Sequence, residues 1–240
     1  MSGHSKWNNI KRKKEATDAK RAKVFTRIGR EMAVCIRQGG PDPVANSALR
    51  DLIAKAKSLN VPNDNIQRTI AKYTNGSGEE YEKITYEGYG PSGVAIIVET
   101  MTDNRNRTAS DMRHYFDKFG GNLGASNCVS WQFDRKGVLI VEREDQDEDE
   151  FMMQALEAGA DDFSADEDGF EIITSEENFE TVRDALAAQG VAFADAELQM
   201  VPQNYVTIND EDALANMQKL LDMLEEDDDV GDVWHNCDNI

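Results

Sequence analysis

The sequence of 240 residues has only three cysteines, five prolines and no long apolar run. The cysteines, Cys35, Cys128 and Cys237, are far apart and form no C-x-x-C pair, which argues against a disulfide framework. We therefore expect reduced thiols in a cytoplasmic protein. No apolar run approaches the roughly 18 residues that a membrane-spanning helix needs, so we expect no contact with a membrane. The basic N-terminus has no apolar segment after it, which argues against a secretory signal.

Residue sets typical of enzymes and metal sites are also missing. The three histidines, His4, His114 and His235, lie in different regions without the spacing of metal ligands. Neither G-x-S-x-G nor G-K-[ST] occurs. The acidic clusters at 145–150 and 225–229 lack the spaced Asp and Asn residues and the glycine of a calcium loop, so we interpret them as solvated charge at helix ends. The sequence therefore predicts no catalytic residues, no metal and no cofactor.

One stretch, GYGPSG at residues 88–93, fits the pattern G-x-G-x-x-G of dinucleotide-binding loops. That motif requires a helix directly after the glycines, because the pyrophosphate binds at the helix N-terminus. Here the apolar, β-branched run VAIIVET follows, which is typical of a strand. We therefore predict a turn between two strands, in which the glycines supply positive φ angles.

Positive charge is scarce except at one end of the chain. Residues 1–76 hold 16 Lys and Arg against 6 Asp and Glu, a net charge of +10, although the whole chain carries −20. Residues 136–240 hold 4 basic residues against 31 acidic ones. A segregated charge of this kind predicts a polyanionic partner for the N-terminal region and repulsion of that partner by the C-terminal region. The acidic region could instead contact a protein partner.

The N-terminal region predicts a basic arm of about fifteen residues and three helices. The first helix spans about 18–38, the second starts near Pro43, and the third follows Pro62. Basic side chains release counterions from phosphates, an aromatic ring can stack on an exposed base, and Asn can pair with base edges. The predicted nucleic-acid-binding residues of this region are Lys6, Trp7, Asn8, Lys11, Arg12, Lys13, Lys14, Lys20, Arg21, Lys23, Arg27 and Arg30. The alternatives are a solvated arm, or a basic segment that docks on the protein's own acidic region.

Arg105 and Arg107 complete the predicted nucleic-acid-binding set. They open a helix predicted after the cap candidates Asp103 and Asn104. Positive charge at a helix N-terminus is unfavourable for the helix dipole. The pattern therefore indicates either an external anion or an internal acidic partner such as Glu87.

The remaining pattern predicts strands and helices in alternation, in an α+β protein. From residue 137 the order is β-α-β-β-α-β, which is typical of a ferredoxin-like unit. Strands predicted at 82–87, 93–101, 128–134, 204–208 and 230–235, with a helix at 210–225, would complete a second such unit. We expect three domains: a basic three-helix domain at 1–76, a discontinuous α/β domain at 77–135 plus 203–240, and an acidic ferredoxin-like domain at 136–202 inserted into it.

Several motifs together resemble the YebC/PmpR family. They are GHSKW at 3–7, RKK at 12–14, DAKR at 18–21, YEGYGPSG at 86–93, DNRNRT at 103–108, GGNLG at 120–124 and VWHN at 233–236. The resemblance covers the chain from its first residues to its last. It implies a helical N-terminal domain with two ferredoxin-like domains, and a cytoplasmic regulator.

The resemblance leaves two functions open. Members of the family are described as DNA-binding transcriptional regulators, and relatives that include a mitochondrial translational activator act on the ribosome. We therefore predict a regulator that binds duplex DNA, with ribosomal RNA as the alternative partner. The absence of a clear helix-turn-helix pair favours binding to the phosphate backbone or to shape over direct sequence readout.

Overall fold

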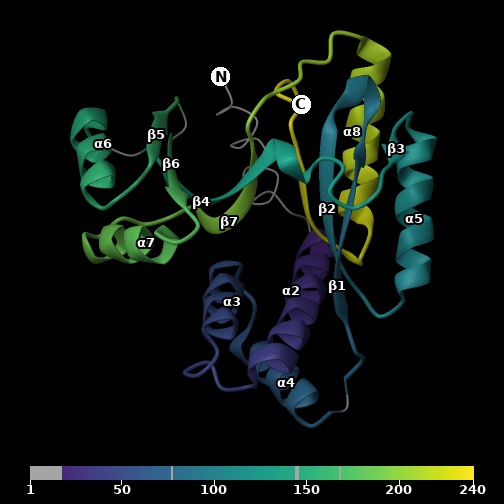
Figure 1. The fold of residues 1–240 in the computed structure, drawn as a ribbon. Helices are drawn as coiled ribbons and strands as arrows, with labels where there is room; N and C mark the ends of the chain where they lie inside the picture. The colour runs from purple at the N-terminus through teal and green to yellow at the C-terminus, as the bar shows by residue number, and fades with distance from the viewer. Residues whose placement is uncertain (1–17, 77, 144–145, 168) are drawn as a thin grey trace. The chain divides into compact units, whose positions relative to one another are not determined.

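The computed structural model describes residues 18–76, 78–143, 146–167 and 169–240 (Figure 1). Helices and strands alternate after three N-terminal helices, so the protein is of the α+β class. The described chain forms two compact units, residues 18–128 with 210–233 and residues 129–209 with 234–240. The predicted boundaries of three domains stay a prediction.

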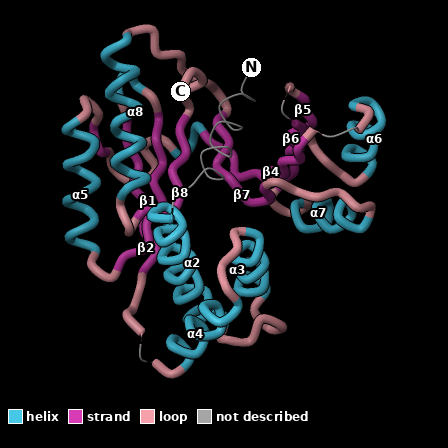
Figure 2. The backbone as a smooth tube through the Cα atoms, turned by 180° about the vertical axis from the view of Figure 1, so that it is seen from behind, coloured by secondary structure: helices cyan, strands magenta, loops and turns pink. Residues whose placement is uncertain are grey.

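The N-terminal region consists of three helices around a small apolar core. They are α2 (Asp18–Gly39), α3 (Ser47–Ser58) and α4 (Asn63–Thr74). Figure 2 shows them packed together, and their shared core contains Ile28, Met32, Leu49, Ala56 and Ile66. The helix predicted at about 18–38 is confirmed, and its buried residues Ile28, Met32 and Ile36 follow a helical period.

The start of the second helix differs from the prediction. Asp42 caps a turn by accepting a hydrogen bond from the Val44 amide at 2.9 Å, and α3 begins only at Ser47. Asn46 is the N-cap, since its side chain accepts from the Leu49 amide at 3.1 Å. Its amide group also donates to the carbonyls of Cys35 and Gly40, each at 2.8 Å. Asn46 therefore joins the end of α2 to the start of α3.

The first sheet has four strands in the order β3-β1-β2-β8. These strands are β1 (Glu82–Tyr89), β2 (Ala95–Thr102), β3 (Asn122–Leu123) and β8 (Val230–His235). β1 pairs antiparallel with both β2 and β3. Helices α5 (Arg105–Lys118) and α8 (Glu211–Glu226) lie on the same side of β1 and β2 (Figure 2). They bury Met112, Phe116, Met217, Leu220 and Leu224.

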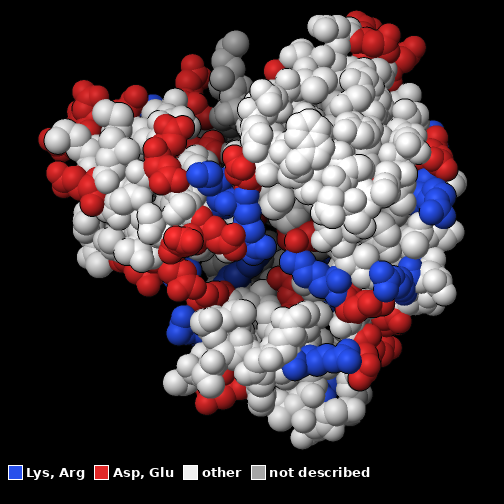
Figure 3. Space-filling model, viewed as in Figure 1, with Lys and Arg blue, Asp and Glu red and all other residues white. Residues whose placement is uncertain are grey.

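The second sheet is antiparallel, with the order β5-β6-β4-β7 and the chain order β-α-β-β-α-β of a ferredoxin-like unit. Its elements are β4 (Phe133–Glu142), α6 (Glu148–Glu157), β5 (Asp162–Ala165), β6 (Gly169–Ser175), α7 (Phe179–Ala188) and β7 (Asp195–Pro202). Phe151, Phe170 and Val182 lie in its core. Asp and Glu side chains gather on the visible surface over α6 and α7 (Figure 3), as the charge pattern predicts.

Two predicted strands are wrong. Residues 128–134 do not form a strand of their own, because Ser130–Gln132 is a short 3-10 helix and Phe133 already belongs to β4. The expected strand at 204–208 is reduced to one bridge between Val206 and Cys237. Both segments connect the two sheets along the chain, where a few apolar residues among polar ones imitate a strand.

The GYGPSG segment is a turn between β1 and β2, and a 3-10 helix (Pro91–Gly93) fills it. Only Gly93, with a φ of +78°, uses the freedom expected of these glycines. A Cβ atom at Gly88 would lie 2.6 Å from the Asn122 carbonyl oxygen, so glycine there permits the close approach of β3. The loop thus joins two strands of the sheet, and strand β2 follows the glycines where a dinucleotide-binding loop requires a helix.

Candidate nucleic-acid interface

The predicted binding residues fall into three groups in the structure. Lys6, Trp7, Asn8 and the basic run Lys11, Arg12, Lys13 and Lys14 lie outside the described residues. Lys20 and Arg21 belong to the first turns of α2, and their side chains also lie outside the description. Lys23, Arg27 and Arg30 of α2, with Arg105 and Arg107 of α5, are described in full.

Lys23, Arg27 and Arg30 all contact the segment that links α8 to β8. Lys23 donates to the Glu226 carbonyl, and Arg27 forms an ion pair with Asp232. Arg30 binds the Asp228 carbonyl and the Asp229 carboxylate. These three side chains are spaced at helical intervals, so they share one face of α2. That face is held against the acidic segment of residues 226–232, which we call the acidic segment below.

Asp229 is the centre of these contacts, and its side chain is only 6% exposed. Its Oδ1 atom accepts a hydrogen bond from Arg30 Nη1 at 2.7 Å. Its Oδ2 atom accepts from Arg107 Nη2 at 2.7 Å, from Thr108 Oγ1 at 2.8 Å and from Thr102 Oγ1 at 3.1 Å. A buried carboxylate needs this many donors, because desolvation otherwise disfavours its charged form.

Burial and hydrogen bonding shift the pKa of Asp229 in opposite directions. Burial raises this pKa, and the hydrogen bonds from Arg107, Thr108 and Thr102 lower it. The lowering is larger than the rise, so the pKa lies below the ordinary value of 3.8. The neighbouring Asp227 behaves differently, since burial leaves its pKa raised although Tyr115 Oη donates to it at 3.0 Å. The fold therefore stabilises the charged form of Asp229 but not that of Asp227.

The acidic cluster at 225–229 was expected to be solvated charge, and for Asp229 that expectation is wrong. The physical reason is the convergence of Arg30 and Arg107, which are 199 and 122 residues away along the chain. No local pattern of the sequence contains such a pairing. We therefore find a buried ion-pair cluster where the sequence indicated a polar helix end.

Arg105 and Arg107 were expected to meet either an external anion or an internal acidic partner, and Arg107 has internal acidic partners. The partners are Asp229 and Asp103, each at 2.7 Å, and not Glu87. Glu87 is buried elsewhere and accepts a hydrogen bond from the Asn127 amide at 2.8 Å. Arg105 begins α5 and is exposed to solvent. The positive charge of Arg107 at this helix end is thus balanced by Asp229 and Asp103.

A further cation on α4 was missed by the sequence reasoning. Arg68 is exposed, and no described residue forms an ion pair or hydrogen bond with its guanidinium. It lines a hollow between α2 and α4. The positive balance of the region could have drawn attention to it, but no motif distinguishes Arg68 from its neighbours.

Two further properties of the described residues concern membranes and metals. None of the described helices is long and apolar enough to cross a membrane. No group of three or more His, Cys, Asp or Glu side chains in the described ranges is arranged to hold a metal ion.

Comparison with known proteins places this geometry in a family. Residues 5–76 match the description "TACO1/YebC protein N-terminal domain", and residues 81–237 match "TACO1/YebC second and third domain". A "Probable transcriptional regulatory protein" of Acetivibrio thermocellus is 55% identical, with 98% of each chain covered. A protein of the same name from Finegoldia magna is 54% identical over the full length of both chains.

A solved structure is similar throughout the fold. The crystal structure of a conserved hypothetical protein from Aquifex aeolicus matches with a TM-score of 0.84 and 44% identity, covering 92% of this chain and 91% of that one. The fold and the family matches support the same assignment. The three helices fall in the part matched as the N-terminal domain, and the GYGPSG turn and both sheets fall in the part matched as the second and third domain. The chain belongs to the TACO1/YebC family.

Proposed function

We propose that the protein is a cytoplasmic nucleic-acid-binding regulator that binds DNA and controls transcription. The relatives named above are called transcriptional regulatory proteins, and DNA binding is our extension of those names. A binding protein of this kind needs no catalytic residues. Its working parts are cations placed where they reach phosphates.

The observation that carries the proposal is the excess of positive charge in residues 1–76, 16 basic against 6 acidic residues. The acidic segment neutralises only part of it, through Lys23, Arg27 and Arg30. Nucleic acid would have to displace internal partners to use these three side chains. We therefore assign the main contact to the arm residues Lys6, Trp7, Asn8, Lys11, Arg12, Lys13 and Lys14, continued by Lys20 and Arg21.

The proposed mode of binding is largely independent of sequence. Phosphate contacts fix position and contribute most of the salt-dependent affinity, whereas base contacts are needed for specificity. The second helix of the region, α3, presents few side chains that read base edges. The unit built on the second sheet carries Asp and Glu side chains over α6 and α7 (Figure 3), so we expect it to repel the same phosphates and to suit a basic protein partner.

The second candidate function is action on the ribosome. The family description includes TACO1, and the arm combines Trp7 with basic residues, a mixture that also suits exposed bases of ribosomal RNA. Both functions need the same positive arm. They differ in whether the bound partner is duplex DNA or a ribosome.

Co-sedimentation with ribosomes separates the two functions. Lysate treated with DNase is centrifuged at near-physiological salt with wild type and with a variant in which Lys11, Arg12, Lys13 and Lys14 are replaced by Glu. If wild type travels with ribosomes and the variant does not, translation is the function and DNA binding is a consequence of charge. If wild type stays soluble and binds duplex DNA with an affinity that falls as salt is raised, while the variant does not bind, the transcriptional proposal stands.

The variant also tests the arm itself. Charge reversal of four arm residues should leave the thermal unfolding midpoint close to that of wild type while binding is lost, because these charged residues belong to no apolar pattern that would form part of a core. Binding by the folded variant at wild-type strength would show that the arm is not the contact.

A further inference from the structure

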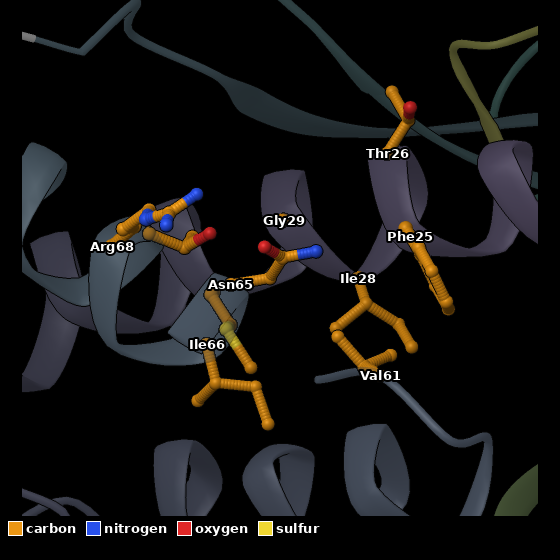
Figure 4. Close-up of a pocket in the computed structure, with 10 residues that line it drawn as sticks. Phe25, Thr26, Ile28, Gly29, Val61, Asn65, Ile66 and Arg68 are labelled. Carbon is orange, nitrogen blue, oxygen red and sulfur yellow. The ribbon is translucent and has the colours of Figure 1, made fainter. Parts of the chain in front are cut away.

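A hollow of about 290 Å³ lies between α2 and α4, on the basic helical region (Figure 4). Its size is at the lower end of the range for small-ligand pockets. The floor is apolar and consists of Ile28, Met32, Val61 and Ile66, all of which belong to the core of the three helices. The floor is thus fixed by the packing of the domain.

Gly29 opens this hollow in the middle of α2. Glycine is, after proline, the least favourable residue inside a helix, so its presence there calls for a reason. Its φ angle is not positive, and a Cβ atom built on it would have no atom of the described residues within 4 Å outside its chain neighbours and its own helix backbone. By contrast, a Cβ at Gly39 of the same helix would lie 2.7 Å from Asn46. Neither backbone conformation nor packing against the described residues therefore requires glycine at position 29.

The rim of the hollow carries an aromatic ring and polar groups. Phe25 is half-buried on α2, and in Figure 4 its side chain points to the same side of the helix as that of Ile28. Asn65 and Arg68 of α4 line the hollow and are exposed. A flat, largely apolar ligand with hydrogen-bonding edges fits this combination. A ring can lie on Phe25 and over Gly29 while its edge meets the Asn65 amide.

Arg68 indicates that the ligand is a nucleic-acid strand with a phosphate, and not a nucleobase alone. Its guanidinium has no partner among the described residues, and it stands beside the hollow where a phosphate next to an inserted base would lie. Arginine binds phosphate with two parallel hydrogen bonds. A base in a duplex cannot enter such a hollow without leaving its stack, whereas an unpaired base can.

We propose that the α2–α4 hollow accepts one unpaired base of a single-stranded nucleic acid, with Arg68 on the adjoining phosphate. The inference rests on the proposed nucleic-acid function and names the form of nucleic acid that the helical region selects. The strand could come from a ribosomal RNA loop or from opened DNA, which share the unpaired base and the phosphate.

The test fills the hollow without disturbing the helix. Gly29→Leu begins a side chain at a Cβ position that has open space around it, and leucine is a good helix former. Gln67→Leu is the matched control, because Gln67 is exposed on α4 next to Arg68 and does not line the hollow. Binding of the full chain is measured by fluorescence anisotropy to a 12-nucleotide RNA, to the DNA strand of the same sequence and to the corresponding DNA duplex.

We expect Gly29→Leu to weaken binding of the single strands about tenfold, the order of one lost base-stacking contact, while duplex binding and thermal stability are unchanged. Gln67→Leu should bind all three probes as wild type does. Tighter binding of RNA than of DNA would identify the RNA source, and the reverse would identify opened DNA.

The inference is overturned if folded Gly29→Leu binds single strands as tightly as wild type. It is also overturned, with the proposed function left standing, if wild type binds the duplex and not the single strands. If wild type binds none of the three probes, the inference and the proposed function both fail.

Discussion

Arg30 on α2 and Arg68 on α4 belong to the same helical region, but their surroundings differ. The Arg30 side chain is 16% exposed and binds Asp229, whereas Arg68 is exposed and has no described partner. On the α2 face, the acidic segment neutralises the cations and they contribute to the fold. On the α4 side, the cation stands beside a hollow and is available to a ligand.

The comparison teaches that a basic stripe on a helix does not identify a binding surface. The sequence indicates how many cations one face carries, and the tertiary structure decides which of them already have partners. Three of the predicted binding residues, Lys23, Arg27 and Arg30, share a face with helical spacing and contact acidic residues far along the chain. Their binding to nucleic acid stays a prediction that competes with these contacts.

The largest expected effect follows from removal of the central carboxylate. Asp229→Ala leaves Arg30 and Arg107 without their shared partner, and we expect a loss of about 3 kcal/mol in the free energy of unfolding. The measurement is urea unfolding followed by circular dichroism. Asp228→Ala is the control, since that exposed neighbour removes the same charge and should cost less than about 0.5 kcal/mol. Equal losses in the two variants would contradict the central place of Asp229.

A smaller effect is expected on acidification. The pKa of Asp229 lies below its ordinary value of 3.8, so its contribution to stability is complete above that value and is lost as the pH falls through the lower, folded-state pKa. Wild type should therefore be more stable than Asp229→Asn by a constant amount from pH 7 to about pH 5, and the difference should shrink below about pH 4. Thermal unfolding across this range is the measurement. A difference that grows in acid would show that the sign is wrong.

The smallest effect concerns the salt dependence of binding. Arg68→Met removes one proposed phosphate contact, so the slope of log affinity against log salt should fall by roughly one, or somewhat less for a single strand. Gln67→Met should leave the slope unchanged, because it adds a similar side chain without loss of charge. Anisotropy titrations at four salt concentrations measure both slopes, and a wild-type slope for Arg68→Met would place Arg68 outside the interface.

Much of the fold could be predicted because it depends on local pattern. The apolar arc that contains Ile28 and Met32 predicted α2, and the alternation after residue 137 predicted the ferredoxin-like sheet. The prediction was wrong where a short apolar segment such as 204–208 connects larger elements. A segment of this length is too short for its pattern of apolar residues to distinguish a strand from an extended connection.

The candidate site could be predicted less completely. The excess of basic residues at 1–76 follows from counting, but the pairing of Arg30 with Asp229 joins residues 199 positions apart. Likewise, Gly29 in the sequence is only a glycine inside a helical pattern. Its structural role depends on the hollow beside it, which is formed by the packing of α4 against α2.

The most direct test of this account compares Arg30→Met with Arg68→Met in the same two measurements, urea unfolding and binding to a single-stranded oligonucleotide. We predict that Arg30→Met lowers stability by about 1–3 kcal/mol, as loss of a charged hydrogen bond should, and leaves affinity within about twofold of wild type. Arg68→Met should retain wild-type stability and bind several-fold more weakly. If Arg30→Met loses the affinity and Arg68→Met does not, the α2 stripe is the binding surface and the account is contradicted.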